Sequence, residues 1–95
     1  MNVREELVKI LNKHNTTIKC AVVNRADWDT DCVTTIIVDE EHTEDDVAMM
    51  LLRIDFDPNV APYGLEIDSL IFLNNGCSVS VVDNGKVFWQ YNTGK

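Results

Sequence analysis

Basic residues are nearly absent from the middle of this chain. Between Arg25 and Asn84, fourteen carboxylates accompany a single cation, Arg53, so this segment has a net charge of −13 in a protein whose total is −8. Without a basic patch to neutralise phosphates, direct binding of nucleic acid or of an anionic membrane is disfavoured. The same charge attracts basic partners, and it is the main functional signal in the sequence.

Paired cysteines and long apolar runs are also missing. The three cysteines, Cys20, Cys32 and Cys77, form no C-x-x-C motif, and no apolar run approaches the ~20 residues of a membrane span. The N-terminal stretch has acids at Glu5 and Glu6 and no small-residue cleavage site, so it does not resemble a signal peptide. We expect a cytoplasmic protein whose thiols are reduced and buried.

Signatures of catalysis and of cofactor binding are absent as well. His14, on a predicted helix stripe, is expected at the edge of the core, and His42 in a solvated loop; neither belongs to a nucleophile motif. No phosphate-binding glycine loop and no zinc-type Cys/His spacing is present. A chain of 95 residues leaves little room for a deep cleft. We therefore expect a protein that is not an enzyme and that takes no cofactor or metal.

What is present begins with two segments of helical periodicity. Residues 2–14 form the first, with Asn2 as its cap, and residues 43–54 form the second, with Thr43 as its cap. The apolar stripe of the second is wider, so we expect that helix to be more buried than the first. The first stripe consists of Val3, Leu7, Ile10, Leu11 and His14; the second consists of Val47, Met50, Leu51 and Ile54 and is widened by Ala48, Met49 and Leu52.

The remaining segments predict antiparallel strands. Residues 16–24 and 32–38 are rich in β-branched types, and the polar loop 25–31 between them predicts a hairpin. After an irregular loop at 55–64, two Asn-Gly turns predict a three-stranded meander. The expected strands of the meander are 65–73, 77–82 and 86–91, joined at Asn75-Gly76 and Asn84-Gly85.

These elements predict a single α+β domain over residues 1–95, in the order α-β-β-α-β-β-β. Two helices would pack on an antiparallel sheet in a two-layer arrangement that ends in the three-stranded meander. One placement joins the hairpin and the meander into a single five-stranded sheet. The strand order is left open.

Two acidic stretches flank the predicted strand 32–38, and both are candidate partner-binding sites. An extended strand would hold them about 20 Å or more apart, so they form either one long stripe or two unrelated solvated loops. Acids in a first helical turn also stabilise the helix, which accounts for the last three without any ligand. The candidates are Asp27, Trp28, Asp29 and Asp31 before the strand, and Asp39, Glu40, Glu41, Glu44, Asp45 and Asp46 after it.

Residues 27–31, DWDTD, resemble the start of a calcium loop because three carboxylates alternate along them. The sixth loop position, usually glycine, is Cys32, and the twelfth, where a glutamate is needed, is Val38. We therefore favour a solvated acidic turn over a calcium site. Trp28 within this turn either anchors an interface or folds back over the edge of the sheet, and both interpretations stay open.

The segment IDFDPNVAPYGLEIDSLIFLNNGCSVSVVDNGKVFWQY resembles a pattern found in small proteins of phages and prophages. There a meander carries two Asp-Gly or Asn-Gly turns and ends in a tryptophan-rich strand. A small, acidic, cofactor-free α+β chain is also similar in type to phage-encoded inhibitors, including anti-CRISPR and anti-restriction proteins, several of which present carboxylates in place of phosphates. The matching positions are Asp55, Phe56, Asp57, Tyr63, Gly64, Asn75, Gly76, Asn84, Gly85 and Trp89.

Charge and resemblance together lead to one expected function. The resemblance implies a phage or mobile-element protein, and the charge implies that it binds a host protein with a basic surface, as a nucleic-acid-mimicking inhibitor does. The alternative is an accessory domain that self-associates, for example as a homodimer, with the acids serving solubility.

Overall fold

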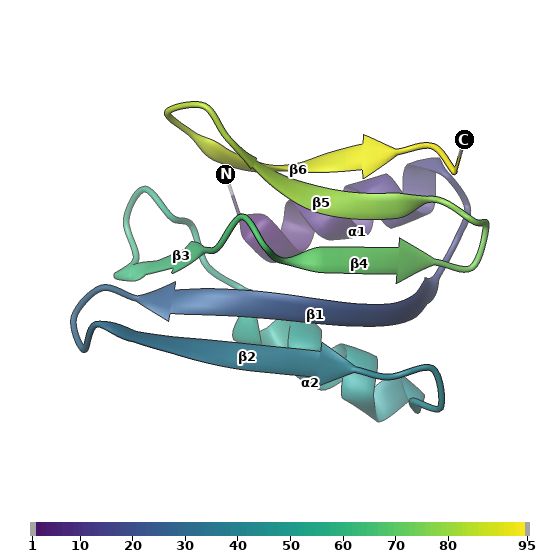
Figure 1. The fold of residues 1–95 in the computed structure, drawn as a ribbon, viewed down its shortest axis with the longest axis horizontal. Helices are drawn as coiled ribbons and strands as arrows, with labels where there is room; N and C mark the ends of the chain where they lie inside the picture. Colours follow the sequence, from purple (N-terminus) through teal and green to yellow (C-terminus); the bar gives the residue numbers. More distant parts are fainter. Residues whose placement is uncertain (1, 95) are drawn as a thin grey trace.

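The structure is a computed structural model and describes residues 2–94. Two helices, α1 (Val3–Lys13) and α2 (Glu44–Arg53), lie on one face of a six-stranded antiparallel sheet (Figure 1). The expected two-layer α+β architecture is therefore confirmed. Within residues 2–94 no helix covers the opposite face, which leaves one side of the sheet open.

The hairpin and the meander form one continuous sheet. Its strands run in the order β2-β1-β4-β5-β6, and the short β3 pairs with β1 beyond the end of β4. The helices cover the two halves of this sheet: α1 packs toward β6 and α2 toward β2. The strands are β1 (Ile18–Asp27), β2 (Cys32–Val38), β3 (Tyr63–Leu65), β4 (Leu70–Leu73), β5 (Ser78–Asp83) and β6 (Val87–Asn92).

Two expected strand boundaries are wrong. The strand expected at 16–24 runs on to Asp27, because Arg25, Ala26 and Asp27 pair with both β2 and β3. The polar loop is therefore 28–31 rather than 25–31. The strand expected at 65–73 is broken at 66–69 into β3 and β4, which gives six strands instead of five.

A cluster of polar side chains explains the break at 66–69. The backbone N–H of Asn24 donates to Ser69 Oγ at 2.8 Å, so a hydroxyl replaces the carbonyl that a regular strand would offer. The Glu66 N–H donates to Asn24 O at 2.9 Å, and Asn24 Nδ2 donates to Asp68 Oδ1 at 3.0 Å. Ser69 is buried, and its hydroxyl gives the Asn24 N–H a hydrogen-bond partner inside the protein.

Local chemistry places the helix starts and the meander turns where the sequence predicts them. Asn2 Oδ1 accepts the Glu5 N–H at 3.1 Å, and Asp46 Oδ2 accepts the Thr43 N–H at 2.9 Å. Gly76 and Gly85 have φ values of +84° and +100°, the left-handed region that glycine adopts without strain. Both Asn-Gly turns are therefore confirmed.

The core lies between the helices and the inner face of the sheet. Trp89 is buried in it, as its alternation with Val87 and Tyr91 predicts, and its Nε1 donates to the Val3 carbonyl at 3.0 Å. At the core edge, the rings of His14 and Tyr91 stack with centroids 3.5 Å apart. The largest fully buried apolar side chains are Leu7, Met50, Ile54, Ile71, Leu73, Val3, Val23, Val38 and Val79.

The second helix is less buried than expected. Within α2 only Met50 is fully buried, whereas α1 buries both Val3 and Leu7. Met49 and Leu52, two of the residues that widen the apolar stripe, are 50% and 66% exposed, so this flank of the helix faces solvent. The reason is position: α2 packs against β2, which is an edge strand of the sheet.

The cysteines also differ from expectation. All three are free thiols, but Cys32 is exposed and Cys20 and Cys77 are half-buried, so none is the fully buried residue that was expected.

Within residues 2–94, neither helix has both the length and the apolar character that crossing a bilayer requires.

Candidate functional site

The first acidic group, named here the hairpin cluster, consists of Asp27, Asp29 and Asp31 in the turn between β1 and β2. Asp27 Oδ1 accepts the backbone N–H groups of Asp29 at 3.1 Å and Thr30 at 3.4 Å, so this carboxylate shapes the turn. Asp31 has a φ of +55°, a conformation that aspartate tolerates better than most residues. Asp29 and Asp31 are exposed, so their carboxylates are open to a partner.

Trp28 in the same turn folds back over the sheet and yet stays largely exposed. Its backbone N–H donates to the Pro62 carbonyl at 2.8 Å, which ties the turn to the segment before β3. Its ring lies on Gly64, where an added Cβ would come within 2.6 Å of Trp28 Cζ2. The side chain nevertheless stays 61% exposed. Trp28 is therefore held in place over β3 and still offers a large apolar surface.

The second acidic group, the loop cluster, comprises the six acids Asp39, Glu40, Glu41, Glu44, Asp45 and Asp46. Asp39 Oδ1 accepts the Glu41 N–H at 3.0 Å, and Asp46 acts in the helix cap. His42 is half-buried, not the solvated residue that was expected, because its Nδ1 lies 2.6 Å from the Asp39 carbonyl oxygen.

Few cations balance these two clusters. Among the described residues 2–94, they form one ion pair, between Glu40 Oε1 and Lys19 Nζ at 3.8 Å. Arg25, which precedes the hairpin cluster, is directed elsewhere: its Nη1 donates to the Arg53 carbonyl at 3.1 Å and its guanidinium lies 4.7 Å from the centre of the Tyr63 ring. Most carboxylates of the two clusters therefore have no ion pair among residues 2–94, and both clusters keep a net negative charge.

The fold does not bring the two clusters together. They lie at opposite ends of β2, at the left and right of Figure 1, and the seven residues of that strand span about 20 Å. No residue of Cys32–Val38 is charged. The candidate surface is thus an uncharged strand with a cluster of carboxylates at each end.

Four of the other five acids of the segment are used locally. Asp55 accepts Asn2 Nδ2 at 2.8 Å, Asp68 binds Asn24, and Asp83 Oδ1 accepts the Gly85 N–H at 3.2 Å. The Asn59 N–H, 2.9 Å from Asp57 Oδ1, holds the pKa of that carboxyl below its usual value. These four acids contribute to the fold and belong to neither cluster.

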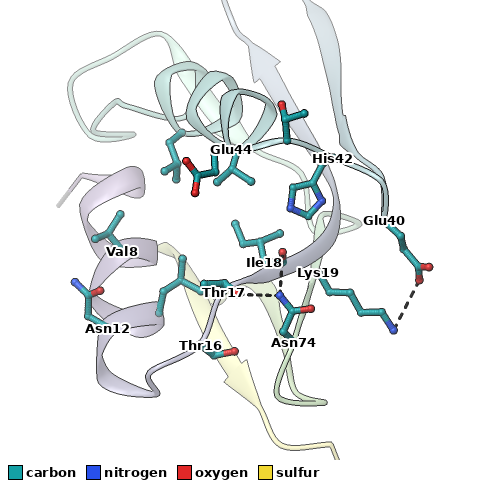
Figure 2. A pocket seen from close by; sticks show the side chains of 14 residues that line it. Val8, Asn12, Thr16, Thr17, Ile18, Lys19, Glu40, His42, Glu44 and Asn74 are labelled. Atoms are coloured by element: carbon teal, nitrogen blue, oxygen red, sulfur yellow. Dashed lines mark hydrogen bonds and ion pairs between the residues drawn. The ribbon is translucent and has the colours of Figure 1, made fainter.

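A groove of about 790 Å³ lies between the two helices and was not foreseen from the sequence (Figure 2). Val8 and Leu11 of α1 and Val47 and Leu51 of α2 line it, with Ile18 of β1 among its lining residues. On one side the loop cluster borders it through Glu40 and Glu44, beside His42. The groove exists because two helices that are far apart in sequence face one another in the fold. The sequence of either helix alone does not predict this arrangement.

The open face of the sheet is a second feature that sequence reasoning missed. Val22, Val33, Ile37 and Phe72 share this face, since each is paired across the ladder with another residue of the same side. All four are exposed.

Alternation along the first strand suggests that Ile18, Cys20 and Val22 share one face, and this is wrong: a register shift between Ile18 and Cys20 turns Val22 to the open face and Ala21 and Val23 to the core. Alternation also could not show that, within residues 2–94, no helix covers the open face.

Within residues 2–94, no three His, Cys, Asp or Glu side chains converge in a way that could hold a metal ion. Asp27 Oδ1 accepts two backbone N–H groups of its own turn, those of Asp29 and Thr30. Comparison with protein-family models, with curated proteins and with solved structures found no match to this chain. Its function has to be argued from its own surface.

Proposed function

We propose that this protein acts by binding, without catalysis, and that its acidic surface occupies the nucleic-acid-binding site of a basic host protein. In this proposal it is a phage or mobile-element protein that works in the cytoplasm of the host cell. The observation that carries it is the pair of acidic clusters, whose nine carboxylates have one ion pair, Glu40 with Lys19, among residues 2–94.

The physical basis is competition for cations. A lysine or arginine that binds phosphate also binds carboxylate, and a rigid array of carboxylates has already lost much of its conformational entropy. Here the hydrogen bonds of Asp27, Asp39 and Asp46 to nearby backbone N–H groups fix the two clusters in position. Association should be fast and should weaken steeply with salt.

The spacing of the clusters restricts the partner. The two acidic clusters lie about 20 Å apart. They fit a partner with basic residues on both sides of a groove better than a partner with a single compact basic patch. Trp28, exposed beside the hairpin cluster, supplies the apolar anchor that such interfaces use.

The test is capture of host proteins by the immobilised protein at low and at high salt, with identification of what is bound. We expect recovery of a nucleic-acid-binding protein at low salt, and inhibition of its nucleic-acid binding by the free protein. The double variants Asp29→Asn/Asp31→Asn and Glu40→Gln/Glu41→Gln should each weaken the complex. Glu5→Gln, an exposed acid on α1, is the matched control and should leave it unchanged. Failure to recover any nucleic-acid-binding protein at low salt would refute the proposal.

Self-association is the second candidate, and the open sheet face favours it. A face with Val22, Ile37 and Phe72 exposed can be buried against a second copy, with the acids serving solubility. Sedimentation separates the two candidates: a homodimer that persists at high salt supports self-association, and a monomer at all salt concentrations excludes it.

A further inference from the structure

Strand β2 forms one edge of the sheet, and its outer side is unpaired within the described part of the chain. Natural edge strands are commonly protected by a charge, a proline or a bulge along their length. The sequence of β2, CVTTIIV, has none of these, and its pairing with β1 runs over seven residues without a bulge. The edge is therefore open to a further strand.

Hydrogen bonds on the other side of β1 show which residues of β2 point outward. The N–H groups of Trp28 and Asn24 bond toward the β3 and β4 side, to Pro62 O and Ser69 Oγ. The N–H and C=O groups of successive residues in a strand point to alternate sides. The odd-numbered residues of β1 therefore form their backbone hydrogen bonds with β2. Their partners in the ladder are Cys32, Thr34, Ile36 and Val38.

The residues between these partners, Val33, Thr35 and Ile37, therefore direct their N–H and C=O groups away from the sheet. The same three side chains lie on the open face, where Val33 is 55% and Ile37 67% exposed. An added strand would find three backbone positions to pair with and two apolar side chains to contact.

We propose that β2 accepts an extended segment of the partner as an additional strand, apolar and β-branched at its centre and carrying Lys or Arg at both ends. The basic ends would meet the hairpin cluster beyond Cys32 and the loop cluster beyond Val38. Because both ends of β2 are acidic, charge favours such a segment in either direction along the edge. The inference rests on the proposed function, since it states what the basic partner presents to the two clusters.

A second copy of this chain is a poor occupant of the same edge. Antiparallel pairing of two β2 strands about Thr35 places Val33 opposite Ile37, which is favourable. The same register places Asp31 of each copy opposite Asp39 of the other, so like charges meet at both ends of the interface. Charge complementarity therefore selects a basic partner over self-pairing.

The test uses a synthetic peptide, Lys-Arg-Thr-Val-Thr-Val-Thr-Arg-Lys, labelled for fluorescence anisotropy. Its control is the same peptide with the central amides N-methylated, which keeps the charge and removes the strand's hydrogen-bond donors. We expect the unmodified peptide to bind at least about tenfold more tightly than the methylated one at low salt. Hydrogen exchange at the amides of Val33, Thr35 and Ile37 should slow on binding.

Two variants at one position locate the contact. Thr35→Pro removes an outward N–H without removing a ladder bond to β1, and should reduce peptide affinity about tenfold. Thr35→Val keeps that N–H while losing the hydroxyl that donates to Asn24 Oδ1 at 2.7 Å, and should bind like the natural protein. If Thr35→Pro does not fold, Ile37→Lys serves instead, because it places a repelling cation on the exposed side of the same edge.

Equal affinity for the two peptides, or no change in exchange at the three amides, would overturn strand addition. The proposed function would survive that result, because charge-driven capture and the cluster variants test it separately. The choice of a basic partner would be overturned if the protein formed homodimers at low salt, with or without the peptide, and if dimerisation slowed hydrogen exchange at the β2 amides. Loss of both peptide binding and low-salt capture would remove both proposals.

Discussion

Ser69 shows how one side chain sets the course of a strand. Its buried hydroxyl accepts the Asn24 N–H at 2.8 Å and lies 3.4 Å from the Asn24 carbonyl, so it takes the place of a backbone partner. The residue pattern of 65–73 predicts one strand. It carries no information on whether the hydroxyl of Ser69 will bond to the backbone of Asn24. That is why the interruption between β3 and β4 could not be predicted.

Replacing this hydroxyl should be costly. Ser69→Ala leaves the N–H of Asn24 without its acceptor in a buried place, and we expect unfolding to become easier by about 1–3 kcal/mol. Urea denaturation measures the change. Thr93→Ala, an exposed position in the C-terminal segment, is the control and should shift stability by less than about 0.5 kcal/mol. Equal shifts in the two variants would contradict the role given to Ser69.

Asp57 predicts a dependence of stability on pH. The hydrogen bond from the Asn59 N–H lowers the pKa of this carboxyl below its ordinary 3.8. A carboxyl with a lowered folded pKa stabilises the protein above its unfolded pKa, and the contribution is lost as the pH falls through the folded value. Asp57→Asn should therefore lower the melting temperature at pH 7, and the difference should vanish as the pH falls from there through the lowered pKa of the folded protein. A difference that stays constant across this range would contradict the assignment.

At the scale of elements, the sequence predicted both helices and most strands within a few residues. Caps such as Asn2 and turns such as Asn75-Gly76 act locally, so they can be recognised without knowledge of the fold. The burial of α2 was not predictable in this way. Its apolar stripe is wider than one neighbour can cover, and only the fold shows that β2 is an edge.

The two faces of α2 should respond differently to mutation. Met50 is fully buried, so Met50→Ala should destabilise the protein by about 2–5 kcal/mol. Leu52 is 66% exposed, so Leu52→Lys should cost less than about 0.5 kcal/mol. Chemical denaturation of both variants checks this. A large loss for Leu52→Lys would mean that this flank of α2 is covered in solution, for example by a second copy.

At the scale of the whole molecule, composition predicted the site in part. The acidic residues of both clusters, and their separation along the strand 32–38, follow from sequence alone. Three features could not be predicted, because each depends on which elements become neighbours: the free edge of β2, the open sheet face and the groove between the helices. Charge can be counted along a chain, whereas exposure is a property of the assembled fold.

The unbalanced charge predicts that salt stabilises this protein. Carboxylates within each cluster repel one another, and raising the NaCl concentration from roughly 0.02 to 0.5 M shortens the screening length several-fold. We expect the melting temperature to rise with salt by several degrees. The variant Glu41→Gln, altered at an exposed position of the loop cluster outside the first turn of α2, should melt higher at low salt and gain less from added salt. A melting temperature that falls with NaCl would contradict the repulsion.

The hydrogen bond from Trp89 to the Val3 carbonyl has a consequence for the folding of this chain. It joins α1, the first element, to β6, the last, across 86 positions of sequence. Contacts of such long range require the closure of a large loop, which slows folding. During synthesis, α1 can form early, but its docking has to wait until β6 has been made. The apolar stripe of that helix stays without its native cover until then, and this interval is when the nascent chain is most exposed to aggregation.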